Sequence, residues 1–219
     1  MLSSARSRPN FWISRYLWGG VGLGILSGFV SFYLAHISGG GGGAFSLPQW
    51  PSPQWLFSAS IVWSGLAFLY FHWVSGTLLS KPLPRNKPIF WFIAASSSLY
   101  LSLNLSLFFL IFNPPQWFSL FGLIGIIGAS IVLIGYSLGI SRLSLRSIVY
   151  ALAVGFVAPL YEDISSFNSL RGTYAMWTPI DPFLLTLILW QTGILIVLGN
   201  ALYRSRHAQT KTPTPTSDQ

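Results

Sequence analysis

Six apolar runs dominate the pattern of hydrophobic and polar positions along the chain. At about 1.5 Å of rise per helical residue, most of these runs are long enough to cross the hydrocarbon core of a bilayer. The fifth is shorter than the others. The pattern therefore predicts an all-α fold, a polytopic transmembrane helical bundle with six spans. The predicted spans cover residues 16–37, 55–76, 89–112, 118–140, 147–161 and 183–203.

Polar segments and turn-forming residues separate the runs and divide the chain into three parts. Residues 1–15 form a basic lead, and residues 16–203 form the six-span domain. Residues 204–219 form a polar tail rich in Thr and Pro, for which we expect disorder. A secretory signal peptide is an alternative for the first run. Its apolar stretch is longer than the usual signal core of about 7–15 residues, which favours a retained helix.

Composition agrees with a membrane protein. Only 7% of the residues are charged and 52% are hydrophobic, whereas soluble domains carry about 25% charged residues. A net charge of +8 would point to nucleic acid in a soluble protein. Here the basic residues flank apolar runs, so we expect lipid and no nucleic acid as partner. The chain has no cysteine, which excludes disulfides and thiolate metal sites.

The charged residues also predict an orientation. If the amino terminus is cytoplasmic, six spans place every Lys and Arg except Arg171 on the cytoplasmic side. This agrees with the positive-inside rule and puts both termini in the cytoplasm. The bacterial plasma membrane is the default location, and a photosynthetic or organellar inner membrane obeys a similar rule.

Small residues recur at four-residue spacing in two runs. Gly20, Gly24 and Gly28 form a ridge on the first run, and Ala151 and Gly155 have the same spacing on the fifth. Such ridges allow another helix backbone to approach closely. We expect them to pack helices together or to bind another membrane protein.

Glu162 and Asp163 follow the fifth run, and Arg171 lies further along the same segment. An acidic group below the lipid headgroups is costly and by default functional, with Arg171 as the candidate partner. In the alternative interpretation, the two acids begin a solvated outer loop and only end the span. The sequence is compatible with both interpretations of the acidic pair.

The third run is the most polar of the six. It carries Ser98, Ser102, Asn104 and Ser106, and its three serines lie four residues apart on one helix face. These side chains could line a polar path for a solute. More often such serines pack helices through hydrogen bonds, here with Gln191 and Asn200 of the last run as candidate partners.

Catalytic and metal-binding signatures are missing from the sequence. The three histidines are predicted at different depths, so we expect no metal site and no cofactor, and we assign no catalytic residue. A non-catalytic subunit or assembly factor that binds other membrane proteins, or itself, fits best. Two alternatives are a small transporter or solute-binding subunit that uses Glu162 and Asp163, and a lipid-acting enzyme with one of these acids as acid or base.

Overall fold

A computed structural model of the protein describes residues 11–38, 53–75, 87–110, 120–170 and 182–209. Within these ranges every regular element is helical, so the predicted all-α class is confirmed. A short 3₁₀ helix, η1, covers Phe11–Ile13. The six α-helices are α1 (Arg15–Ser38), α2 (Pro53–Ser75), α3 (Lys87–Leu110), α4 (Leu120–Gly139), α5 (Leu145–Leu170) and α6 (Pro182–Gln209).

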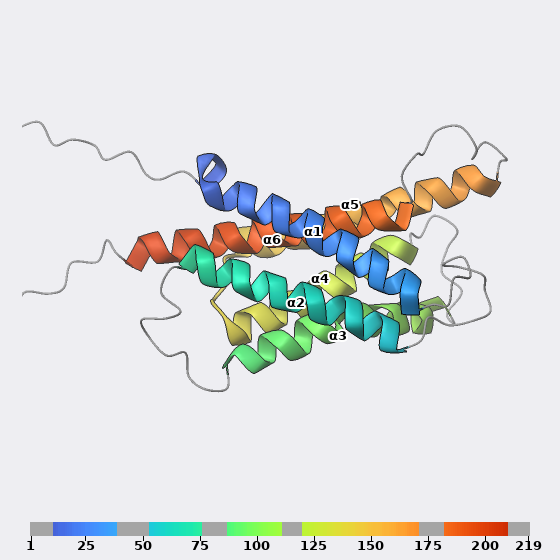
Figure 1. Ribbon diagram of the computed structural model, residues 1–219, viewed down its shortest axis with the longest axis horizontal. Helices are drawn as coiled ribbons and strands as arrows, with labels where there is room; N and C mark the ends of the chain where they lie inside the picture. Colours follow the sequence, from blue (N-terminus) through green and yellow to red (C-terminus); the bar gives the residue numbers. More distant parts are fainter. Residues whose placement is uncertain (1–10, 39–52, 76–86, 111–119, 171–181, 210–219) are drawn as a thin grey trace, which may run out of the picture.

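The helices lie side by side along the long axis of the molecule, and consecutive helices run in opposite directions (Figure 1). Each helix contacts the next along the chain, and α1 also contacts α6, which closes a ring. A further contact between α2 and α6 crosses the ring. Because the number of described helices is even, the start of α1 and the end of α6 lie at the same end (Figure 1).

Three of the described helices are long and apolar enough to cross a membrane, which supports a membrane protein. These stretches are Arg15–Leu34, Gly122–Gly139 and Phe183–Ser205. Pro88–Ser102 and Leu145–Leu160 are shorter apolar helices.

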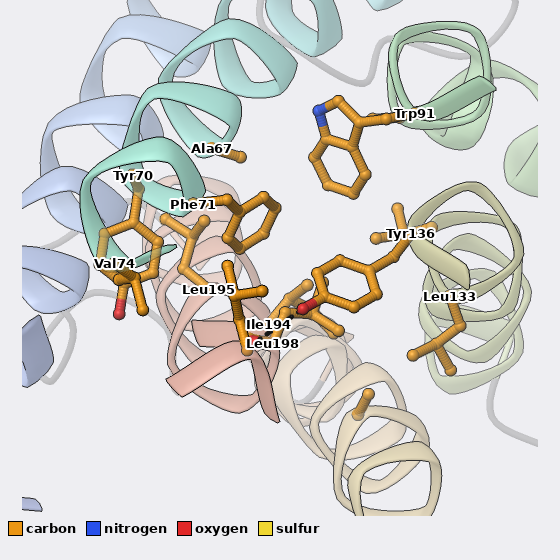
Figure 2. Close-up of a cluster of buried hydrophobic side chains, with 14 of the residues drawn as sticks. Ala67, Tyr70, Phe71, Val74, Trp91, Leu133, Tyr136, Ile194, Leu195 and Leu198 are labelled. Atoms are coloured by element: carbon orange, nitrogen blue, oxygen red, sulfur yellow. Dashed lines mark hydrogen bonds between the residues drawn. The ribbon is translucent and has the colours of Figure 1, made fainter. Parts of the chain in front are cut away.

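The core contains many aromatic side chains. Trp63, Phe71, Trp91 and Tyr136 are almost completely buried. Phe71 contacts the rings of Trp91 and Tyr136 at centroid distances of 5.2 and 5.3 Å, which joins α2, α3 and α4 (Figure 2). Trp63 contacts Trp190 of α6 at 5.3 Å. These rings fill the space that the described parts of four helices enclose.

Several predicted boundaries differ from the structure. The lead was predicted to end at residue 15 outside the bundle, but Phe11 is buried and contacts the ring of Tyr203 at 5.6 Å. The tail was predicted to begin at residue 204, but α6 continues to Gln209. The fifth helix begins before residue 147 and ends at Leu170, well beyond the predicted end at residue 161. Apolar runs mark where a helix can be buried in lipid, whereas a helix itself can continue into polar sequence.

Candidate functional site

The acidic pair lies inside a helix and not at the start of a loop. Glu162 and Asp163 belong to α5, which continues for seven residues after Asp163. The carboxyl-terminal end of α5 extends past the amino-terminal ends of α4 and α6, which lie at the same end of the bundle (Figure 1). The side chains of both acids, and the whole of Arg171, lie outside the described residues. The α5 backbone therefore stays helical through the two acids, while its apolar part ends at Leu160.

Pro159 lies within α5, one turn before the acidic pair, and is buried against α4. A Cβ atom added to Gly125 would lie 2.6 Å from Pro159 Cγ and even closer to the carbonyl oxygen of Gly155. A Cβ added to Gly155 would in turn lie 2.7 Å from the Gly125 carbonyl oxygen. The two glycines thus allow the α4 and α5 backbones to touch, as is common for small residues in membrane helices. Ala151 is also buried.

Two serines of the α3 face, Ser98 and Ser102, are buried, and their hydroxyls bond to their own helix. Ser98 donates to the Ala95 carbonyl at 2.8 Å, and Ser102 donates to the Leu99 carbonyl at 3.0 Å. The amide of Asn104 donates to the Tyr100 carbonyl at 2.8 Å. The side chain of Ser106 lies outside the described residues.

Ser102 packs against a glycine and a tryptophan. A Cβ added to Gly128 of α4 would lie 3.5 Å from both Ser102 Oγ and Trp190 Cζ2. At this ordinary van der Waals spacing, the space beside Gly128 would admit a methyl group. The arrangement supports the packing interpretation of these serines over the polar path.

Gln191 was a candidate partner for the serines of the third run, but the structure places its hydrogen bonds elsewhere. Its side chain is 5% exposed and bonds to α1 instead. Ser27 Oγ donates to Gln191 Oε1 at 2.5 Å, and Gln191 Nε2 donates to Ser31 Oγ at 3.1 Å. The amide therefore links two turns of α1 to one position of α6, in the apolar part of both helices.

Two glycines of the α1 ridge, Gly24 and Gly28, lie along the contact between α1 and α6. A Cβ on Gly24 would lie 2.5 Å from Thr192 Cα, and one on Gly28 would lie 2.9 Å from Ile188 Cα. Gly20 accommodates the Tyr70 hydroxyl, 2.8 Å from its added Cβ. We call this contact the α1–α6 seam. It comprises Gly24, Ser27, Gly28 and Ser31 of α1, and Ile188, Gln191 and Thr192 of α6.

Most polar groups of the aromatic core bond to backbone carbonyls. Tyr70 donates to Tyr16 at 3.0 Å, and Trp91 Nε1 donates to Ser64 at 3.1 Å. Tyr136 donates to Leu198 at 3.2 Å. Four other buried side-chain atoms have no hydrogen-bond partner within the described part of the chain. They are Trp63 Nε1, Thr186 Oγ1, Thr192 Oγ1 and Asn200 Oδ1.

Asn200 was considered a partner of the α3 serines, but its Oδ1 accepts no hydrogen bond from the described residues. Trp91 is an interior residue that sequence reasoning missed, because its position near the start of a span is typical of tryptophans at the membrane interface. Within the described ranges, no three His, Asp or Glu side chains come together as a metal site would require.

The basic side chains gather at one end of the bundle, which we call the basic end. It carries Arg15 at the start of α1, Arg142 and Arg146 at the α4–α5 turn, and Arg204 near the end of α6. All four are exposed. Glu162 and Asp163 lie toward the opposite end of α5. The described arginines therefore lie at one end of the bundle, and the backbone positions of the two acids lie toward the other.

The sequence matches no family model, and no curated protein or solved structure matches it. The basis for proposing a function is therefore the arrangement of the side chains.

Proposed function

We propose that the protein is a six-span membrane protein with both termini in the cytoplasm, and that it acts as a non-catalytic subunit or assembly factor for other membrane proteins. The observation that carries the proposal is the filled interior. Trp63, Phe71, Trp91 and Tyr136 occupy the space between the helices, so a partner is more readily bound at the outer surface than a solute is bound inside. The position of the arginines at one end supports the proposed orientation.

An outward stripe on α1 provides a surface suited to a partner helix. Trp18, Gly22 and Leu26 lie four residues apart and therefore on one face. Trp18 is 71% exposed and Leu26 is 50% exposed. A Cβ added to Gly22 would meet no atom within 4 Å. A glycine between two large exposed side chains forms a notch into which another transmembrane helix can pack.

Gly22→Leu fills this notch and tests the proposal. The full-length chain, extracted from its own membrane in mild detergent, should migrate on a native gel as a complex larger than its own 24.2 kDa plus detergent. Gly22→Leu should reduce the complex without lowering the unfolding temperature. Val157→Leu, on the outward face of α5, is the matched control and should retain it. A monomeric wild-type chain would contradict the proposal.

A transporter or solute-binding subunit is the second candidate. It is favoured by the continuation of α5 through Glu162 and Asp163, one turn after the buried Pro159. Because the chain has no cysteine, Glu162→Cys and Arg171→Cys give single labelling sites. If a membrane-impermeant thiol reagent outside the cell labels position 171 and not position 162, the acidic site is shielded and this candidate gains support. Rapid labelling of both positions argues against it.

A further inference from the structure

A groove runs between α4 and α5 on the outer surface of the bundle. It has a volume of about 360 Å³. Its walls are mainly apolar and are formed by Leu133, Ile134 and Leu138 of α4, Leu143 of the turn, and Ile148 and Leu152 of α5. Ile134 and Leu138 are 60% and 56% exposed. Since α4 is apolar enough to cross a membrane, this groove opens toward lipid in the proposed topology.

The groove reaches the basic end of the bundle. Leu143, which lines it, directly follows Arg142, and Ile148 lies two residues after Arg146. Both arginines are exposed. Two exposed cations therefore lie where the apolar walls end, Arg142 in the turn and Arg146 at the start of α5. Positive charge at the cytoplasmic ends of membrane helices attracts anionic lipid headgroups.

Hydroxyl groups occur at two depths in the groove. Ser137 is exposed and lies near the carboxyl-terminal end of α4, close to the arginines. Ser130 lies seven residues deeper, about 10 Å along the helix, and its hydroxyl donates to the Ile126 carbonyl at 2.8 Å. The deeper hydroxyl is thus satisfied within its own helix, while the exposed one lies nearer the turn.

We infer that the α4–α5 groove binds an anionic phospholipid of the cytoplasmic leaflet. Its acyl chain lies along Ile134, Leu138 and Leu152, and its phosphate lies between Arg142 and Arg146. Charge decides between this occupant and a neutral lipid, because two exposed arginines adjoin the lining residues at one end of the groove. This inference rests on the proposed topology but not on the proposed partner binding, which uses the outward face of α1.

Removal of the two arginines tests the site. The probes are phosphatidylglycerol and phosphatidylcholine, added to the delipidated full-length protein and detected as bound adducts by native mass spectrometry. Each arginine near an anionic headgroup contributes roughly a factor of five in affinity, so Arg142→Gln/Arg146→Gln should weaken phosphatidylglycerol binding about thirtyfold. Phosphatidylcholine binding should change little.

Arg15→Gln/Arg204→Gln is the matched control, because it removes the same charge from the same end but away from the groove. The control should bind phosphatidylglycerol like the wild type. Equal losses in both double variants would show only a diffuse surface charge and would overturn the inference. Ile134→Trp, which fills the groove, should also reduce binding, whereas Ile93→Trp on the outward face of α3 should not.

Two further outcomes would count against the site. Equal affinity for the two lipids would remove the role of the arginines. A dimer that is lost in Ile134→Trp and forms without any bound lipid would show that a second copy of the chain occupies the groove. Folding of each variant is checked by its unfolding temperature in lipid-free detergent, which the exposed positions of these side chains should leave unchanged.

Discussion

Ser27 of α1 donates a 2.5 Å hydrogen bond to Gln191 of α6, although 164 positions separate the two residues. Both side chains are buried, and Gln191 also donates to Ser31. Hydrogen bonds between membrane helices contribute modestly on average, about 0.6 kcal/mol and up to about 1.7 kcal/mol. The specificity of this pair matters more than its strength, since it selects one rotation of α1 against α6.

The coupling between these two residues can be measured. Gln191→Leu removes both amide bonds at similar side-chain volume and should lower the free energy of unfolding by about 1 kcal/mol. Ser27→Ala should cost less in the Gln191→Leu background than in the wild type, because its partner is already gone. Equilibrium unfolding of the two single variants and the double variant in micelles gives the interaction energy. Strict additivity would show that the hydrogen bond contributes nothing.

Two glycines of α1 should respond in opposite ways to alanine. Gly24→Ala places a methyl group 2.5 Å from Thr192 Cα, which must separate the helices and should destabilise the fold by about 1–3 kcal/mol. Gly22→Ala has open space and should be neutral or slightly stabilising, because alanine favours the helical backbone. Unfolding temperatures of the two variants provide the comparison. If Gly24→Ala is as stable as Gly22→Ala, the α1–α6 seam is looser than described.

Tyr136 supports the aromatic core in two separable ways. Tyr136→Phe removes the hydroxyl bonded to the Leu198 carbonyl and should cost about 0.5–1.5 kcal/mol. Tyr136→Ala also removes the ring that packs on Phe71 and Trp91, and should cost about 3–5 kcal/mol. Equilibrium unfolding of each variant in micelles measures these changes in the free energy of unfolding. Similar losses for the two variants would mean that packing contributes little at this position.

Orientation can be tested at the exposed α4–α5 turn. In the proposed topology Arg142→Cys faces the cytoplasm, so an impermeant thiol reagent should label it only after the membrane is opened. Arg204→Cys, at the same end of the bundle, should behave identically. Labelling of either position from outside intact cells would reverse the orientation or change the number of spans.

Several features were predictable from local sequence. The helix positions follow from the apolar runs, and the all-α class follows because a membrane-buried backbone must satisfy its hydrogen bonds internally. The gathering of arginines at one end follows from their positions between alternate runs. Small residues at four-residue spacing also pointed to close packing. Each of these properties depends on residues near one another along the chain.

The contacts between helices were not predictable in this way. Gln191 was expected to meet serines of α3 and bonds to α1 instead. Trp91 lies in the core although no local pattern marked it as interior, and Phe11 was assigned to the basic lead and is buried. α5 continues through the acidic pair, where the apolar pattern had already stopped.

Helix positions were predictable and helix contacts were not for a physical reason. Helices that are apolar on all sides carry no polar face to mark which side points inward, so hydrophobicity determines that they enter a membrane and not how they rotate. Rotation and pairing depend on matching shapes, such as Gly24 against the Thr192 backbone and Gly125 against Gly155. The sequence by itself determined the helices, the membrane class and the basic flanks. Only the tertiary structure decided which glycine, serine or tryptophan meets which partner, because those contacts join segments far apart along the chain.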